Sequence, residues 1–258
     1  MSRAMRHRDQ RALVTGGSKG IGAAIARHLA SEGASVAITY HADRAAAQDL
    51  VVDLKRKGCR TSAFHADVGE PAQIRALVDM VADEFGAIDV VASNAGVEHH
   101  GALRSITPEA FDQVFRVNVA GQLFLTQAAA AVMPPGGRVV LMSSISARVA
   151  SYHHALYACS KAAVSSLVLS LAPELAEAGI GINAVAPGPT NTDMGRQHAH
   201  TYTHPALRTV PPAVLAAAMN AVGKPAEPRE IAAAVAFLLS PDAAHITGTT
   251  LEVAGGWN

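Results

Sequence analysis

The chain has 258 residues, of which 50% are hydrophobic, and its 21 basic residues balance its 21 acidic residues. This length allows one large α/β domain or two small ones, and the zero net charge gives no reason to expect a nucleic acid or an anionic membrane as partner. The two cysteines lack metal or redox spacing, and residues 1–10 lack the apolar core of a signal peptide. No apolar run reaches the ~18 residues needed to span a bilayer, so we expect a cytoplasmic protein.

Short apolar runs alternate with helical patterns along the chain. Strands are predicted at 11–15, 35–40, 61–65, 88–92, 138–142, 181–186 and 249–253. Helices are predicted at 23–31, 43–57, 71–85, 107–133, 157–178 and 228–239, and residues 189–226 are irregular. Alternating strands and helices predict a parallel sheet covered on both faces. Ligands of such sheets bind beyond the carboxyl ends of the strands, where the strand order reverses.

A glycine turn follows the first predicted strand, where residues 15–22 have the sequence T-G-G-S-K-G-I-G. Glycines at such a place let the backbone approach a pyrophosphate, which the N-terminus of the next helix stabilises. Glycine clusters also occur in ordinary turns, but the position of this one favours a nucleotide site. Its G-x-x-x-G-x-G spacing differs from the G-x-G-x-x-G of the commoner dinucleotide-binding fold.

A second constellation lies in the predicted 157–178 helix. Tyr157 and Lys161 stand four residues apart, which puts them on one helix face. A tyrosine has a pKa near ~10, and an ammonium group close by lowers it. Ser144 lies thirteen residues before Tyr157 and offers a hydroxyl that could hold a carbonyl oxygen. Together the three side chains could exchange a proton with a carbonyl or alcohol oxygen.

These features resemble the short-chain dehydrogenase/reductase family over almost the whole chain. The matching pieces are residues 15–22, Asp67, residues 94–96, Asn118, Ser144, Tyr157, Lys161, residues 187–188 and residues 192–194. The resemblance implies a single-domain α/β protein over 1–258, with residues 1–10 as an N-terminal tail and a Rossmann-like doubly wound parallel sheet. It further implies an NAD(P) cofactor, carbonyl–alcohol redox chemistry and a homotetramer.

The resemblance also implies roles for the catalytic residues Asn118, Ser144, Tyr157 and Lys161. Tyr157 would be the acid/base and Ser144 would orient the carbonyl, with Ser143 as the alternative serine. Lys161 would hold the nicotinamide ribose and lower the pKa of Tyr157. Asn118 would break the long 107–133 helix and anchor a water that relays protons to Lys161.

The implied cofactor contacts come from the strand ends in the first half of the chain, from Tyr157 and Lys161 in the 157–178 helix, and from the segment after residue 186. They are Gly16, Ser18, Lys19, Gly20, Ile21, Gly22, Tyr40, His41, Asp67, Val68, Asn94, Ala95, Gly96, Tyr157, Lys161, Pro187, Gly188, Thr190, Thr192 and Met194.

The choice of nicotinamide cofactor depends on the end of the second strand, which carries no acidic residue at its tip. An acidic residue there would bind the adenosine 2′-OH and select NAD. Lys19, and also Arg44, could instead face a 2′-phosphate, whereas Asp43 would repel one. We predict that NADP(H) is preferred and that NAD(H) remains possible.

On the substrate side, resemblance to hydroxynaphthalene and 3-oxoacyl-thioester reductases points to Ser144, Ser146, His153 and Tyr157. Val97 and Glu98 are further candidates, and the pairs 99–100 and 153–154 are expected at the rim of the pocket. The segment 189–226 is expected to be a lid. It carries His198, His200, Tyr202 and His204, which could bind a metal, but we expect a polar loop and no metal.

The resulting prediction is an NADP(H)-dependent reductase that interconverts a ketone and a secondary alcohol, with a free or carrier-bound small molecule as substrate. One alternative is an NAD-dependent polyol, sugar or other alcohol dehydrogenase, which would use the same residues. Another is a non-catalytic nucleotide-sensing protein, against which the complete proton-transfer set argues.

Overall fold

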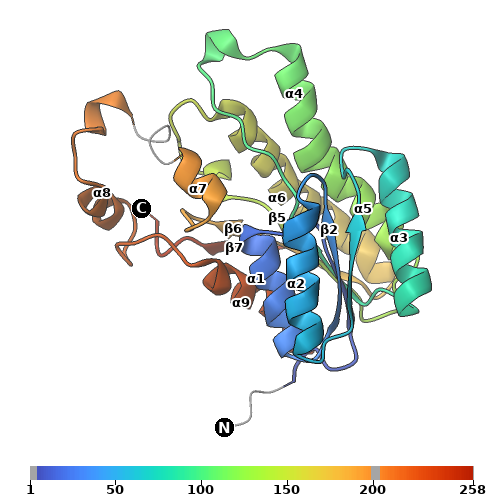
Figure 1. Ribbon diagram of the computed structural model, residues 1–258. Coiled ribbons are helices and arrows are strands. Elements are labelled where there is room, and N and C mark those ends of the chain that lie inside the picture. The colour runs from blue at the N-terminus through green and yellow to red at the C-terminus, as the bar shows by residue number, and fades with distance from the viewer. Residues whose placement is uncertain (1–4, 199–203, 258) are drawn as a thin grey trace.

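A parallel sheet forms the centre of the computed structural model, which describes residues 5–198 and 204–257 (Figure 1). Its strand order is β3-β2-β1-β4-β5-β6-β7, and every pairing is parallel. The strands are β1 (Arg11–Val14), β2 (Ser35–Tyr40), β3 (Thr61–His65), β4 (Val90–Ser93), β5 (Arg138–Met142), β6 (Gly181–Pro187) and β7 (Thr250–Val253). The order reverses between β1 and β4, which is where doubly wound sheets bind ligands. The predicted fold class is confirmed.

Helices cover both faces of the sheet because successive strand residues point to opposite sides. Ala12 and Val14 of β1 pack into a core with α1, α2 and α9, whereas Leu13 packs into a second core with α3, α5 and α6. The α-helices of the described residues are α1 (Gly20–Ser31), α2 (Arg44–Arg56), α3 (Pro71–Phe85), α4 (Pro108–Phe115), α5 (Gly121–Ala130), α6 (Ala155–Glu177), α7 (Asp193–His198), α8 (Pro212–Met219) and α9 (Pro228–Leu239).

The long helix predicted over 107–133 is interrupted. A π-helical turn, Arg116–Ala120, separates α4 from α5, and its C-terminal neighbour Gly121 leaves no room for a side chain. A Cβ at Gly121 would lie 2.7 Å from the carbonyl oxygen of Val68. π-turns are frequent at functional sites, and this one carries Asn118.

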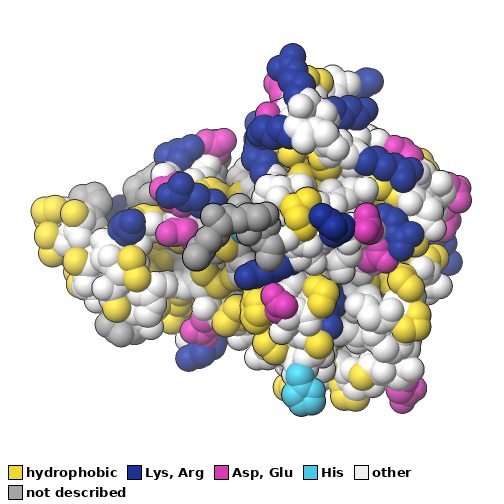
Figure 2. Space-filling model, turned by 90° about the horizontal axis from the view of Figure 1, so that it is seen from below, with side chains coloured by type: hydrophobic (Ala, Val, Ile, Leu, Met, Phe, Trp, Pro, Cys, Tyr) yellow, Lys and Arg dark blue, Asp and Glu magenta, His cyan; other side chains and the backbone are white. Residues whose placement is uncertain are grey.

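The segment predicted to be irregular, 189–226, contains α7 and α8, so that prediction is wrong in part. Short 3-10 turns are also present at Leu103–Ser105, Ile145–Ala147, Pro205–Leu207 and Pro241–Ala243. Prolines at Pro212 and Pro205 begin two of these elements, because a proline fits the first turn of a helix. α7 and α8 lie to one side of the sheet, and hydrophobic side chains gather at the α8 end of the molecule (Figures 1 and 2).

The N-terminal segment is anchored to the domain. The side chain of His7 is fully buried, with Nε2 3.0 Å from the carbonyl oxygen of Ala236 in α9 and Nδ1 2.6 Å from Oε1 of Gln10. Glu32, at the end of α1, lies 3.7 Å from the same Nε2. His7 therefore anchors the N-terminal segment to α9 and to the end of α1.

Among the described residues, α6 is long and apolar enough to cross a membrane by length and composition only, although Lys161 and several serines interrupt its apolar sequence. Core helices of soluble proteins pass the same test. α6 packs on the sheet through Val164 and Val168 and carries a buried lysine, Lys161.

We expect the α1–α9 packing to be a main source of stability. Leu29 of α1 is fully buried in this layer, so Leu29→Ala should lower the free energy of unfolding by about 2–5 kcal/mol. Val52 of α2 is 46% exposed, and Val52→Ala should cost well under about 1 kcal/mol. Denaturant unfolding measures both, and equal losses would contradict the assigned packing.

Candidate functional site

The candidate site lies at the carboxyl ends of the central strands (Figure 1). The glycine turn follows β1, residues 94–96 follow β4, Ser143 and Ser144 follow β5, and Gly188 follows β6. Parallel strands bring their ends to the same edge of a sheet, so segments distant in sequence meet there.

Hydrogen bonds from one threonine join the two central loops. Oγ1 of Thr15 accepts from the backbone N–H groups of Asn94 and Ala95 at 3.0 and 3.1 Å. Nδ2 of Asn94 donates to the carbonyl oxygens of Thr15 and Gly16. The glycine turn and the 94–96 loop are therefore held together at the point where the strand order reverses.

The glycine turn is tight enough to require glycine. Gly16 and Gly20 have φ of +61° and +53°, a region that favours glycine. A Cβ at Gly22 would lie 2.2 Å from the carbonyl oxygen of Gly16. α1 begins at Gly20, earlier than predicted, and has no side-chain cap and no acidic residue in its first turn. Its N-terminal N–H groups and dipole thus suit an anionic phosphate group.

The segment after β6 passes over this turn. A Cβ at Gly20 would lie 3.4 Å from Cγ2 of Thr192, and Oγ1 of Thr190 donates to the carbonyl oxygen of Gly188 at 2.9 Å. A Cβ at Gly188 would lie 2.8 Å from Cα of Ala254, so the end of the chain packs against the same loop.

At the β2 end of the crevice, Lys19 forms an ion pair with Asp43. The hydrogen bond between them is the main cause that raises the pKa of Lys19 and lowers the pKa of Asp43. Asp43 also accepts from N of Ala46 at 2.9 Å and caps α2. Lys19, the cation predicted to meet a 2′-phosphate, is therefore already paired with Asp43, the carboxylate expected to repel that phosphate.

Aromatic rings lie beside this ion pair. His65 is stacked with His41 at 6.1 Å between centroids and is tilted against Tyr40 at 5.5 Å. Oδ1 of Asp67 accepts from N of Gly69 at 2.8 Å and thereby caps the turn after β3.

The remaining predicted cofactor residues lie along the same edge. Ser18 belongs to the glycine turn, Ile21 to the first turn of α1, Val68 to the loop after β3, Pro187 to the last position of β6 and Met194 to α7.

α6 presents Tyr157 and Lys161 one turn apart. Lys161 is 3% exposed, and its Nζ donates to the carbonyl oxygen of Met142 at 2.8 Å and lies 5.4 Å from the centroid of the Tyr157 ring. Burial lowers the pKa of Lys161 to about 8. Oγ of Ser143 is engaged with the carbonyl oxygen of Lys161 and with Ser165, which leaves Ser144 as the serine that interacts with Tyr157.

The pKa of Tyr157 is raised, opposite to the direction predicted from the nearby lysine. Burial is the main cause and the carboxylate of Glu98 adds to it, while the hydrogen bond with Ser144 acts in the lowering direction. The charged form of a phenol is disfavoured both by desolvation and by a like charge. Both effects favour the protonated phenol.

Asn118 joins the loop after β4 to α6. Its Oδ1 accepts from N of Val97 at 2.8 Å, and its Nδ2 donates to the carbonyl oxygen of Val97 at 2.9 Å and to Oγ of Ser160 at 3.1 Å. A Cβ at Gly96 would lie 3.1 Å from Oδ1 of Asn118 and 3.4 Å from Nζ of Lys161. The four residues predicted to be catalytic thus meet around one loop.

The predicted substrate residues are separated. N of Ser146 donates to Oγ of Ser144 at 3.2 Å. His153 is exposed, with φ of +56°, and its ring stacks on Tyr152 at 3.9 Å rather than on Tyr157. Its neighbour His154 is buried and stacks on Tyr157 at 4.5 Å, so the rim position predicted for His154 is wrong.

Glu98, His100 and His154 form a cluster beside Tyr157. The ring of His100 stacks on that of His154 at 4.6 Å, and Glu98 lies close to both. The sequence signal was the occurrence of two histidine pairs, one next to the 94–96 loop and one just before Tyr157.

Among the other histidines, His198 ends α7, and His204 is exposed with its Nδ1 accepting from N of Ala206 at 3.2 Å. His200 and Tyr202 lie outside the described residues.

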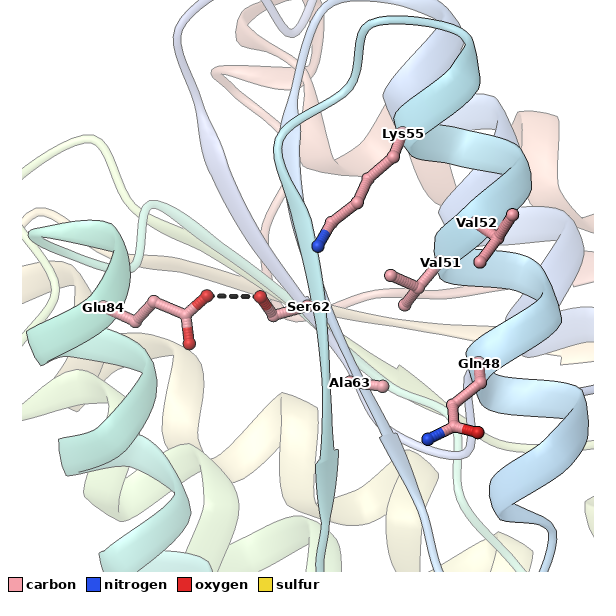
Figure 3. Close-up of a pocket in the computed structure, with 7 residues that line it drawn as sticks. All are labelled: Gln48, Val51, Val52, Lys55, Ser62, Ala63 and Glu84. Atoms are coloured by element: carbon pink, nitrogen blue, oxygen red, sulfur yellow. Dashed lines mark hydrogen bonds between the residues drawn. The ribbon is translucent and has the colours of Figure 1, made fainter.

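A pocket of about 440 Å³ lies away from this site, at the edge of the sheet (Figure 3). Gln48, Val51, Val52 and Lys55 of α2 lie on the side of β3 to which Ala63 points, whereas Ser62 points to the other side and donates a hydrogen bond to Glu84 of α3. None of the predicted site residues lines it.

Comparison with known proteins places the chain among oxidoreductases. Residues 16–258 match the family model described as enoyl-(acyl carrier protein) reductase. The chain is 39% identical over 253 residues to a versicolorin reductase of Emericella nidulans, covering 95% of this chain and 94% of that protein. It is 39% identical over 241 residues to a hydroxynaphthalene reductase of Aspergillus fumigatus, covering 92% and 88%.

A solved structure agrees with these relatives. A short-chain dehydrogenase from Burkholderia cenocepacia, in complex with NADP, superposes with a TM-score of 0.88 at 40% identity, covering 97% of this chain and 98% of that one. The fold agrees with this solved structure over almost the whole of both chains. The chain therefore belongs to the short-chain dehydrogenase/reductase family.

Proposed function

We propose that the protein is an NADP(H)-dependent reductase that interconverts a ketone and a secondary alcohol, with Tyr157 as the acid/base. The observation that carries this proposal is the meeting of Tyr157, Lys161 and Ser144 beside the glycine turn. The relatives named as versicolorin and hydroxynaphthalene reductases support a cyclic, polyketide-type ketone as substrate. The relative solved with NADP supports the choice of cofactor.

The residues present fit a dinucleotide. The tight turn at Gly16 and Gly22, and a first turn of α1 without acidic residues, suit a pyrophosphate. Lys19 would bind a 2′-phosphate after its ion pair with Asp43 is broken and the phosphate takes the place of that carboxylate. Residues 94–96 and Lys161 would meet the nicotinamide ribose. When bound, the nicotinamide supplies the hydride that adds to the carbonyl carbon.

The chain itself would position the carbonyl and deliver the proton. Ser144 and Tyr157 would hold the carbonyl oxygen, and the Tyr157 hydroxyl would give its proton to that oxygen as the alcohol forms. The ammonium group of Lys161 would stabilise the phenolate that remains. Asn118 would fix the loop and Ser160 around Lys161. Before reduction the phenol of Tyr157 carries its proton, whereas burial and Glu98, which raise its pKa, oppose the release of that proton.

We further propose a cytoplasmic homotetramer. Apolar side chains exposed on the two long helical segments support association, since Leu169 of α6 is 68% exposed and Phe111 of α4 is 45% exposed. Basic and acidic side chains are interspersed over most of the face in Figure 2, which fits a protein without a nucleic-acid partner.

Tyr157→Phe should abolish turnover and preserve the cofactor site. Removing the donor hydroxyl should lower kcat for an aromatic ketone by about 10²–10⁴-fold, while the NADPH dissociation constant from fluorescence titration stays within a few-fold. Tyr152→Phe, a nearby tyrosine that stacks on His153, is the matched control and should keep its activity. A Tyr157→Phe enzyme with most of its activity would refute the assignment.

Lys161→Met should abolish activity. It should also remove the free-energy cost of burying a charged ammonium group in the folded protein. The folded pKa of about 8 lies below the unfolded value of 10.5, so the unfolded state binds more protons between these values and wild-type stability rises with pH across them. The full free-energy cost of burying the charged Lys161 is present below about pH 8. Relative to wild type, Lys161→Met should be more stable at about pH 7 than at about pH 10.5, by on the order of 1–3 kcal/mol.

Denaturant unfolding of both proteins at the two pH values measures this offset. An offset that does not change with pH would mean that burial of the charged Lys161 does not cost stability.

Asp43→Asn should sharpen the preference for NADPH. The amide keeps the oxygen that caps α2 but releases Lys19, so the NADPH dissociation constant should fall several-fold while that of NADH stays unchanged. Lys19→Met should do the opposite and weaken NADPH binding by about 10-fold. Fluorescence titrations measure all four constants, and parallel changes for both cofactors would argue against a 2′-phosphate contact at Lys19.

A further inference from the structure

The cluster beside Tyr157 is built from two distant segments. Glu98 and His100 follow β4, and His154 precedes α6. Their side chains are 7%, 11% and 1% exposed, respectively. One carboxylate and two imidazoles are therefore enclosed together, and none of the three gives or takes the proton in the step proposed above.

The distances suit a shared metal ion. Nε2 of His154 lies 3.3 Å from Oε1 of Glu98, and Nε2 of His100 lies 3.7 Å from Oε2. Nitrogen and oxygen ligands bind zinc at about 2.0–2.2 Å, so neighbouring ligand atoms of one ion are about 3–3.5 Å apart. All three ligand atoms lie within 4.8 Å of one another. The two imidazole rings are parallel within 1°, so the lone pairs of their nitrogens, which lie in the ring planes, do not converge on one point. One ring has to rotate for both nitrogens to bind the same ion.

We propose that Glu98, His100 and His154 bind one divalent transition-metal ion of the zinc class. Two imidazoles select zinc, cobalt or nickel over magnesium and calcium, which prefer oxygen ligands. The carboxylate offsets part of the charge of the ion in an enclosed site. Three protein ligands leave a further coordination position open to water or a small ligand.

The proposal concerns a site distinct from the histidines of the 189–226 segment. It does not depend on the proposed reductase activity, because its test measures metal binding alone.

The test is a cobalt titration of the full-length, untagged, chelator-treated protein, because a histidine tag would bind the metal itself. Wild type should bind one equivalent of Co²⁺, seen as visible d–d absorption, and one equivalent of Zn²⁺ should displace it. Glu98→Gln and His100→Ala should each weaken Co²⁺ binding by at least about 10-fold. His204→Ala, a histidine of the other segment, is the control and should bind like wild type.

Circular dichroism melting in the absence of metal should show that each variant is folded, and the near-isosteric Glu98→Gln provides a second variant if His100→Ala is unstable. The proposal is overturned if folded wild type shows no stoichiometric Co²⁺ band. It is also overturned if Glu98→Gln binds like wild type, or if His204→Ala abolishes the band.

Discussion

The hydroxyl of Thr15 joins the two loops on which the candidate site depends. Doubly wound sheets have a crevice where neighbouring strands send their connections to opposite faces, and here that crevice lies between β1 and β4. Oγ1 of Thr15 accepts from two consecutive N–H groups, those of Asn94 and Ala95, across this gap. The same 94–97 loop is held on its other side by the amide of Asn118. The glycine turn and the helix that carries Tyr157 and Lys161 are therefore parts of one hydrogen-bonded framework.

Enclosure gives the site its electrostatic character. Lys161 is a cation whose pKa is lowered by burial, and Tyr157 is an acid whose pKa is raised by burial and by Glu98. Both shifts favour the neutral form, which costs least in an apolar environment. A protonated phenol is the form that reduction of a ketone requires.

The sequence predicts well those features that follow from local patterns. Each strand is found within a few residues of its predicted range, because buried parallel strands are continuous apolar runs. The four-residue spacing of Tyr157 and Lys161 translates directly into one helix face. The π-turn at 116–120 was expected only as a break at Asn118, and α7 and α8 were missed because prolines and histidines hide their short helical patterns. The burial of His154 was also missed, since it depends on a contact with Glu98 far away in the sequence.

The two ends of the candidate site share one constraint. Asp43 pairs with Lys19 at the adenosine end, and Glu98 lies next to Tyr157 at the reacting end. Asp43 would repel the 2′-phosphate of a bound cofactor, and Glu98 would repel the phenolate that Tyr157 becomes in the proposed reaction. Cofactor preference is then a difference between two affinities of Lys19, one for the 2′-phosphate and one for Asp43. Such a difference cannot be obtained from the presence of a lysine in the glycine turn, because it depends on whether the neighbouring carboxylate already holds that lysine.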